Sequence, residues 1–132
     1  MPWLGNDLLK RGVKDISLLM SHFHNDHTGG LNYFKPIYIP GHTVTVAAAL
    51  NYGDLTIEDL VRRHMMEELH PVQYDNLGST MICTGFHAGE AFDLFDGVHV
   101  ETYMLNHPAG CTSYRIEAEG KVLVYATDTE HT

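Results

Sequence analysis

Basic residues and long apolar runs are scarce in this sequence of 132 residues. Its 8 Lys and Arg stand against 17 Asp and Glu, and the formal net charge is −9. Binding of a long nucleic acid needs cations gathered on one face, and these are scattered, so nucleic acid is not an expected partner. No apolar run approaches the roughly 18 residues that span a bilayer. The N-terminus has no charged-then-apolar signal segment. We therefore expect no membrane partner and a cytoplasmic location.

Cysteine is also scarce, and Cys83 and Cys111 form neither a CxxC motif nor a disulfide framework. Cys83 lies in an apolar run and is interpreted as a small buried hydrophobic residue. Cys111 follows His107 by four residues, so a ligand or redox role is kept as an alternative to a structural one. The content of 44% hydrophobic and 19% charged residues is typical of a globular protein. The length fits a single domain over residues 1–132.

The densest pattern is His22-x-His24-x-Asp26-His27, which places four potential metal ligands in six residues. Alternate residues of an extended segment point the same way, with Cα atoms about 6–7 Å apart. The imidazoles of His22 and His24 can therefore converge on one cation. Asp26 and His27 suit a second cation, because a carboxylate and an imidazole offer negative charge and a nitrogen donor to a metal such as zinc. We interpret the motif as a metal site rather than as an exposed histidine-rich loop.

The residues on either side place this motif at the end of a strand. Residues 16–20 form a short apolar run that is typical of a buried strand. Thr28, Gly29 and Gly30 follow the motif, and such small residues let the backbone pass close to a site. Layered α/β folds commonly carry their chemistry at the carboxyl ends of strands. This position therefore favours a functional site over packing.

Periodicity and turn residues predict the other elements. A helix is expected over 4–11, closed by Gly12, and a second helix from a cap at Thr56 and Asp59 to about Leu69. Further strands are expected at 37–39 and 41–47. Two hairpins are expected, 92–95 with 98–105 and 113–118 with 121–126, around Asp-Gly and Glu-Gly turns. The first hairpin leads to His107 and the second to Asp128, each just past a strand.

Three segments together resemble the metallo-β-lactamase-fold superfamily over nearly the whole chain. They are the HxHxDH motif with its Thr-Gly-Gly, the residues 105–110 around His107, and the residues 114–131 around Asp128. The last segment is most similar to the branch of phosphodiesterases and ribonuclease Z-like enzymes. The resemblance implies an α/β fold, an αββα sandwich. The resemblance also implies that this chain forms only part of that fold, because relatives carry strands before the residue that corresponds to Met1 and a further segment after the one that corresponds to Thr132.

Transferred residue by residue, the resemblance implies that His22, His24 and His107 hold one metal. It implies that Asp26 and His27 hold the second metal and that Asp128 bridges the two. Relatives have one more His ligand well after the bridging Asp, and no residue of this sequence occupies its place. His131 is a candidate to substitute for that ligand or to orient another one.

Such a site activates water. Two zinc ions (Zn²⁺), with Mn²⁺ or iron as alternatives, would lower the pKa of a bridging water and produce hydroxide. They would also add about +4 locally, which reverses the sign of an acidic surface for an anionic substrate. Asp26 is the expected catalytic residue, since it would orient the hydroxide and relay a proton. The expected function is metal-dependent hydrolysis of a small phosphodiester or similar ester.

Two alternatives stay open. Imidazole and carboxylate ligands also suit iron, so an iron-dependent redox reaction of the same superfamily is one of them. The other is a metal-binding domain without turnover, for which an exposed sheet edge would favour a homo-oligomer. The remaining histidines have no ligand spacing, and a structural or solvated role is expected for each: His42, His64, His70, His87 and His99.

Overall fold

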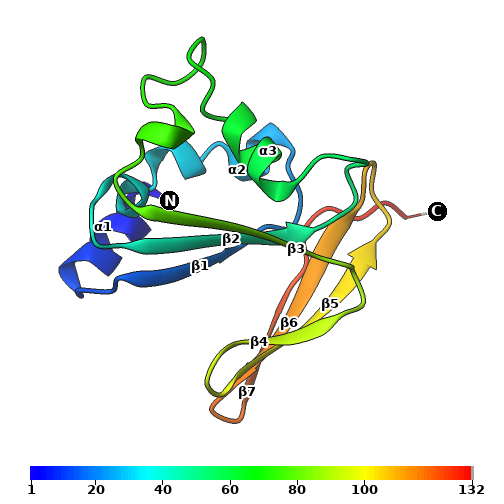
Figure 1. Ribbon diagram of the computed structural model, residues 1–132. Helices are drawn as coiled ribbons and strands as arrows, with labels where there is room; N and C mark the ends of the chain where they lie inside the picture. Colours follow the sequence, from blue (N-terminus) through cyan, green and yellow to red (C-terminus); the bar gives the residue numbers. More distant parts are fainter. Residues whose placement is uncertain (132) are drawn as a thin grey trace.

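The chain, described here for residues 1–131 from a computed structural model, folds into two sheets with helices on one side (Figure 1). The first sheet has the order β1-β2-β3 and is parallel, and the second has the order β4-β5-β6-β7 and is antiparallel. The helices are α1 (Pro2–Lys10), α2 (Asn25–Thr28) and α3 (Ile57–Arg63), with short 3-10 helices at Leu31–Tyr33, Lys35–Tyr38 and Tyr74–Asn76. The strands are β1 (Asp15–Leu19), β2 (Thr43–Ala49), β3 (Thr80–Phe86), β4 (Ala91–Phe95), β5 (Val98–Leu105), β6 (Cys111–Ala118) and β7 (Lys121–Tyr125).

Strand β2 connects the two halves of the core because both of its faces are buried. Val44 and Val46 are fully buried on the helix side, in the cluster that includes the apolar residues of α3. Ala47 and Ala49 belong to a second cluster with Tyr114 of the other sheet. The middle strand of a covered parallel sheet is apolar on both faces. The layers are therefore helices, first sheet and second sheet, in that order (Figure 1).

The predicted helix ends follow the expected local chemistry. Helix α1 ends at Lys10 and Gly12 has φ +68°, the left-handed conformation expected of it. Thr56 caps α3: its Oγ1 accepts from the Asp59 N–H at 3.1 Å, and Asp59 Oδ2 accepts from the Thr56 N–H at 2.8 Å. The hydrogen bonds that the Thr56 N–H and hydroxyl donate to the Asp59 carboxylate lower the pKa of Asp59. The capping box read from the sequence is confirmed.

Two predicted elements were wrong. The strand expected at 37–39 is instead the end of the 3-10 helix Lys35–Tyr38, because the Pro36 ring fixes a helical φ and Ile37 N–H bonds back to Phe34 O at 3.1 Å. Helix α3 stops at Arg63 instead of reaching about Leu69. There the Asn32 side chain donates to the carbonyl of His64 at 2.8 Å, the group that another helical turn would use.

Both hairpins are confirmed, with β4 and β5 around Gly97 and β6 and β7 around Gly120. Strand β4 carries a bulge near Asp93. All five residues of the edge strand β7 are exposed. None of the helices formed by residues 1–131 combines the length and apolarity that crossing a membrane requires.

A pair of leucine substitutions tests where the core lies. Leu31 is 2% exposed and Leu69 is 74% exposed. We expect Leu31→Ala to lower the free energy of unfolding by about 2–5 kcal/mol, since it removes buried methyl groups and leaves a cavity. Leu69→Ala removes the same atoms from the surface and should change it by less than about 0.5 kcal/mol. Urea denaturation followed by circular dichroism measures both, and equal effects would contradict the burial described.

Candidate metal centre

Three strands end at one edge of the molecule and bring the candidate ligands together. The HxHxDH residues follow β1 of the first sheet, whereas His107 follows β5 and Asp128 follows β7 of the second. Cross-links hold the segments in place: the Thr112 N–H donates to Ser21 O at 2.8 Å, and the Glu130 N–H donates to Asn106 O at 2.6 Å. The described segment that follows β7 runs along this same edge (Figure 1).

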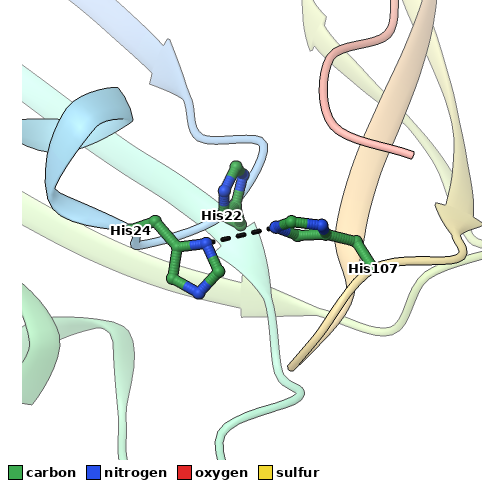
Figure 2. A group of neighbouring side chains, drawn as sticks. All are labelled: His22, His24 and His107. Carbon is green, nitrogen blue, oxygen red and sulfur yellow. Dashed lines mark hydrogen bonds between the residues drawn. The ribbon is translucent and has the colours of Figure 1, made fainter. Parts of the chain in front are cut away.

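His22, His24 and His107 form the first group. One ligand nitrogen from each lies within 4.8 Å of the others. Figure 2 shows the three rings facing one another, with His107 Nε2 and His24 Nδ1 separated by 3.1 Å. The ring centroid of His22 lies 4.6 Å from that of His24 and 4.9 Å from that of His107. Three imidazoles converging from two sheets are a typical ligand set for one divalent cation.

His22, His27 and Asp128 form the second group, with ligand atoms again within 4.8 Å. Asp128 Oδ1 lies 3.2 Å from His27 Nε2, and Asp128 Oδ2 lies 3.9 Å from His22 Nε2 and 3.7 Å from His107 Nε2. The Asp128 carboxylate thus contacts residues of both groups. The resemblance implied that Asp128 bridges two metals.

His22 is the most constrained of these side chains. It is 2% exposed, and its Nε2 is buried without a hydrogen-bond partner among the described residues, while its Nδ1 lies 3.2 Å from Ser21 Oγ. Burial, followed by the neighbouring His27 and His24, lowers the pKa of His22, and Asp128 acts in the opposite direction. A neutral imidazole with a free, buried nitrogen is what a cation needs from a ligand. The residues present therefore fit a divalent metal ion.

Asp26 and His131 lie outside both groups. The Asp26 side chain is 78% exposed, and its Oδ2 is 3.4 Å from His27 Nε2. It stands beside the second group at the rim of the site. His131 is exposed, and the cluster formed by the described residues does not include it.

The remaining candidates have ordinary surroundings. Three of the histidines expected to be structural make hydrogen bonds: His42 to Ile39 O, His70 to the Tyr38 hydroxyl and His99 to Asp93. His64 is half-buried, and burial lowers its pKa, whereas His87 is exposed. Cys111 is fully buried with its Sγ 3.2 Å from Thr127 Oγ1, and Cys83 is half-buried with a pKa raised by burial. Neither thiol belongs to the ligand groups found among residues 1–131.

Sequence reasoning missed the residues that hold the ligand loop. The Tyr114 hydroxyl donates to Met20 O at 2.6 Å, and the Phe23 N–H donates to the Tyr52 hydroxyl at 3.1 Å. The partners are 94 and 29 residues apart, respectively. Tyrosines at such separations carry no local pattern, so only a tertiary structure could find them.

A small surface depression of about 550 Å³ lies beside His107, and its lining consists of Asn51, Met104, Leu105, Asn106, His107, Ala109 and Gly110. A larger groove of about 780 Å³ lies between the sheets, next to residues at the amino ends of β1 and β2 such as Asp15 and Thr43. Among the described residues, His107 is the candidate ligand that lines the smaller depression, and the lining of the larger groove includes none of the candidates.

Comparison with known proteins supports the fold. No protein-family model matches the chain, and no curated protein matches it. Among solved structures, it is similar to the metallo-beta-lactamase fold protein YhfI from Bacillus subtilis, with a TM-score of 0.56 and 18% sequence identity. The match covers 88% of this chain and 42% of that one, so the chain spans less than half of its length. At this identity the likeness establishes the fold alone: the chain has a metallo-β-lactamase-like fold with a histidine and aspartate cluster that could hold a metal.

Gly110 lies in the turn after His107, and Gly97 lies in the turn between β4 and β5; the two form a matched pair for a test. Gly110 and Gly97 have φ of +77° and +75°, but a Cβ at Gly110 would lie 2.5 Å from both Asn51 Nδ2 and Met104 Sδ, whereas one at Gly97 meets nothing within 4 Å. Asn51 Nδ2 also donates to Ala109 O. Gly97→Ala should cost about 1–2 kcal/mol of unfolding free energy for backbone strain alone. We expect Gly110→Ala to cost more and to shift the NMR signals of His107. A cost no larger than that of Gly97→Ala would contradict this packing.

Proposed function

We propose that this chain is a metal-dependent hydrolase that holds two zinc ions and acts on a small phosphodiester or similar ester. One observation supports this most strongly: His22 belongs to both groups of ligand atoms, and its buried Nε2 has no hydrogen-bond partner among the described residues. Leaving such a nitrogen without a partner costs about 1–3 kcal/mol. A bound cation would remove that cost.

The ligands are assigned as the sequence predicted. His22, His24 and His107 would hold the first ion, Asp26 and His27 the second, and Asp128 would bridge them. Imidazoles and carboxylates suit Zn²⁺, with Mn²⁺ or iron as alternatives. When bound, such cations act as Lewis acids that lower the pKa of a water and stabilise negative charge.

Orientation of the water, proton transfer and the shape of the substrate site would depend on the chain's own residues. Asp26 is exposed at the rim and close to His27, so its carboxylate can orient a water and accept a proton from it. The depression beside His107 is within the size range of small-molecule sites, about 300–1,000 Å³. Its lining contains neither Lys nor Arg. The attraction for an anionic ester would therefore come from the cations and from no side chain of the depression.

A second candidate function is metal binding without turnover. It is favoured by the position of Asp26, whose side chain is 78% exposed and outside both groups of converging atoms. The second group then offers only His27 and Asp128 besides the shared His22. One ion in the three-histidine group would satisfy His22 without assembling a second site.

Metal content and hydrolysis of a chromogenic phosphodiester, on protein purified without chelator, separate these functions. The proposed hydrolase contains two zinc ions per chain, and His24→Ala abolishes turnover. The matched control is His99→Ala, a half-exposed histidine that pairs with Asp93 away from the cluster; it should retain both metal and activity. One ion per chain without turnover would support the second candidate, and no bound metal would overturn both.

Asp26→Asn tests the proton-transfer role. We expect kcat to fall about 10²-fold to 10⁴-fold, because an amide cannot accept the proton. The ion in the three-histidine group should stay bound, as measured by metal content. The control Asp93→Asn changes an equally exposed carboxylate on β4 and should leave kcat unchanged. Unchanged kcat in Asp26→Asn would show that the carboxylate takes no part in the reaction.

A further inference from the structure

Two tyrosine hydroxyls bond the backbone on either side of His22. Before His22 in the sequence, the Tyr114 hydroxyl of β6 donates to Met20 O at 2.6 Å. After His22, the Tyr52 hydroxyl accepts a hydrogen bond from the Phe23 N–H at 3.1 Å. The Phe23 peptide lies directly between His22 and His24 in sequence. The two phenols therefore bond to the stretch of backbone from which both imidazoles extend.

Both tyrosine rings pack against other aromatic side chains. Tyr114 is 1% exposed and belongs to the apolar cluster between the sheets, with its ring 6.1 Å from that of Phe86. Burial raises the pKa of Tyr114, and the pKa of Tyr52 is also raised, chiefly by burial. The Tyr52 ring packs edge-on against Phe23, with centroids 5.6 Å apart and planes at 88°. Neutral hydroxyls on packed rings are suited to fixing a backbone at one position.

We propose that Tyr52 and Tyr114 are positioning residues of the metal site, which hold the backbone from Met20 to Phe23 so that His22 and His24 converge on one cation. This inference rests on the proposed function, since it assigns these hydroxyls to a metal site. Each hydroxyl bonds to a peptide group next to the ligands and would act on them through the backbone. Partners that orient metal ligands typically change metal affinity about 10-fold to 100-fold when removed.

Tyr→Phe substitutions remove the hydroxyl and keep the ring. In Tyr52→Phe the Phe23 N–H loses its partner, and in Tyr114→Phe the Met20 carbonyl does. The matched control is Tyr38→Phe. The Tyr38 hydroxyl also donates to a backbone carbonyl at 2.6 Å, that of Asn32, but Tyr38 lies at the amino ends of β2 and β3, away from the site. Tyr52→Phe and Tyr114→Phe thus each lose one phenol hydrogen bond, and the control Tyr38→Phe loses two, because its hydroxyl also bonds the His70 ring.

The experiment measures Zn²⁺ affinity by chelator competition, the visible absorption of bound Co²⁺, and thermal unfolding of the metal-free chain. We expect Tyr52→Phe and Tyr114→Phe to weaken Zn²⁺ binding about 10-fold to 100-fold and to alter the Co²⁺ spectrum, which reports ligand geometry. Tyr38→Phe should bind Zn²⁺ within about 2-fold of the wild type. A merely structural role would lower the unfolding temperature of all three and leave the Co²⁺ spectrum unchanged.

The outcomes separate this inference from the proposed function. If the wild-type chain binds Zn²⁺ and both tyrosine variants bind it equally well, the inference is overturned and the metal site stands. Weaker binding by Tyr38→Phe to the same degree would also overturn it, since the effect would then be general. If the wild-type chain binds no metal, the proposed function and the inference fall together. Should Tyr114→Phe fail to fold, the half-buried Tyr52 decides the matter alone.

Discussion

A buried imidazole nitrogen without a hydrogen-bond partner costs about 1–3 kcal/mol, and His22 Nε2 has none within residues 1–131. Its ring is 2% exposed at the edge where the two sheets meet. His22 shares one group of ligand atoms within 4.8 Å of one another with His24 and His107, and a second such group with His27 and Asp128. The arrangement is unfavourable for a metal-free protein and favourable for one that holds a cation. The site is therefore best understood as a set of ligands organised around this nitrogen.

The two sheets contribute differently to this site. The first sheet supplies the loop after β1, and the second supplies single residues at the ends of β5 and β7. Ligands on strand ends are precise only when the sheets are fixed relative to each other. The Thr112 N–H to Ser21 O bond and the Tyr114 hydroxyl bond to Met20 O make that connection next to the ligands. Packing of Ala47 and Ala49 against Tyr114 supports it from within the core.

Charge constrains what the site can attract. The chain has a formal charge of −9, and the depression beside His107 contains no basic side chain. An anionic ester would meet an acidic protein unless cations were bound, because a divalent ion is the largest charge in its neighbourhood. Under the proposed function, metal binding and substrate binding would therefore be coupled, and the scarcity of Lys and Arg would make that coupling stronger than in a protein with a basic pocket.

Local patterns predicted the elements that depend on local chemistry. Gly12 after α1, the Thr56 and Asp59 cap, and the turns of both hairpins were read correctly, since each rests on neighbouring residues. One of the two errors arose where a distant group intervened. Helix α3 ends early because the Asn32 side chain takes the His64 carbonyl, a contact across 32 residues. The strand expected at 37–39 failed for a local reason that was underestimated, the fixed φ of Pro36.

The sequence by itself determined which residues could bind a metal. The His22 to His27 motif was identifiable from side-chain type and local spacing, whereas His107 and Asp128 were implied as ligands by the resemblance of their segments to the metallo-β-lactamase-fold superfamily. Tertiary structure alone decided which of them meet: it placed Asp128 against both groups, left Asp26 exposed and set two distant tyrosines on the ligand backbone. The physical reason is that convergence depends on how two sheets pack, and packing is a property of the whole core rather than of any segment.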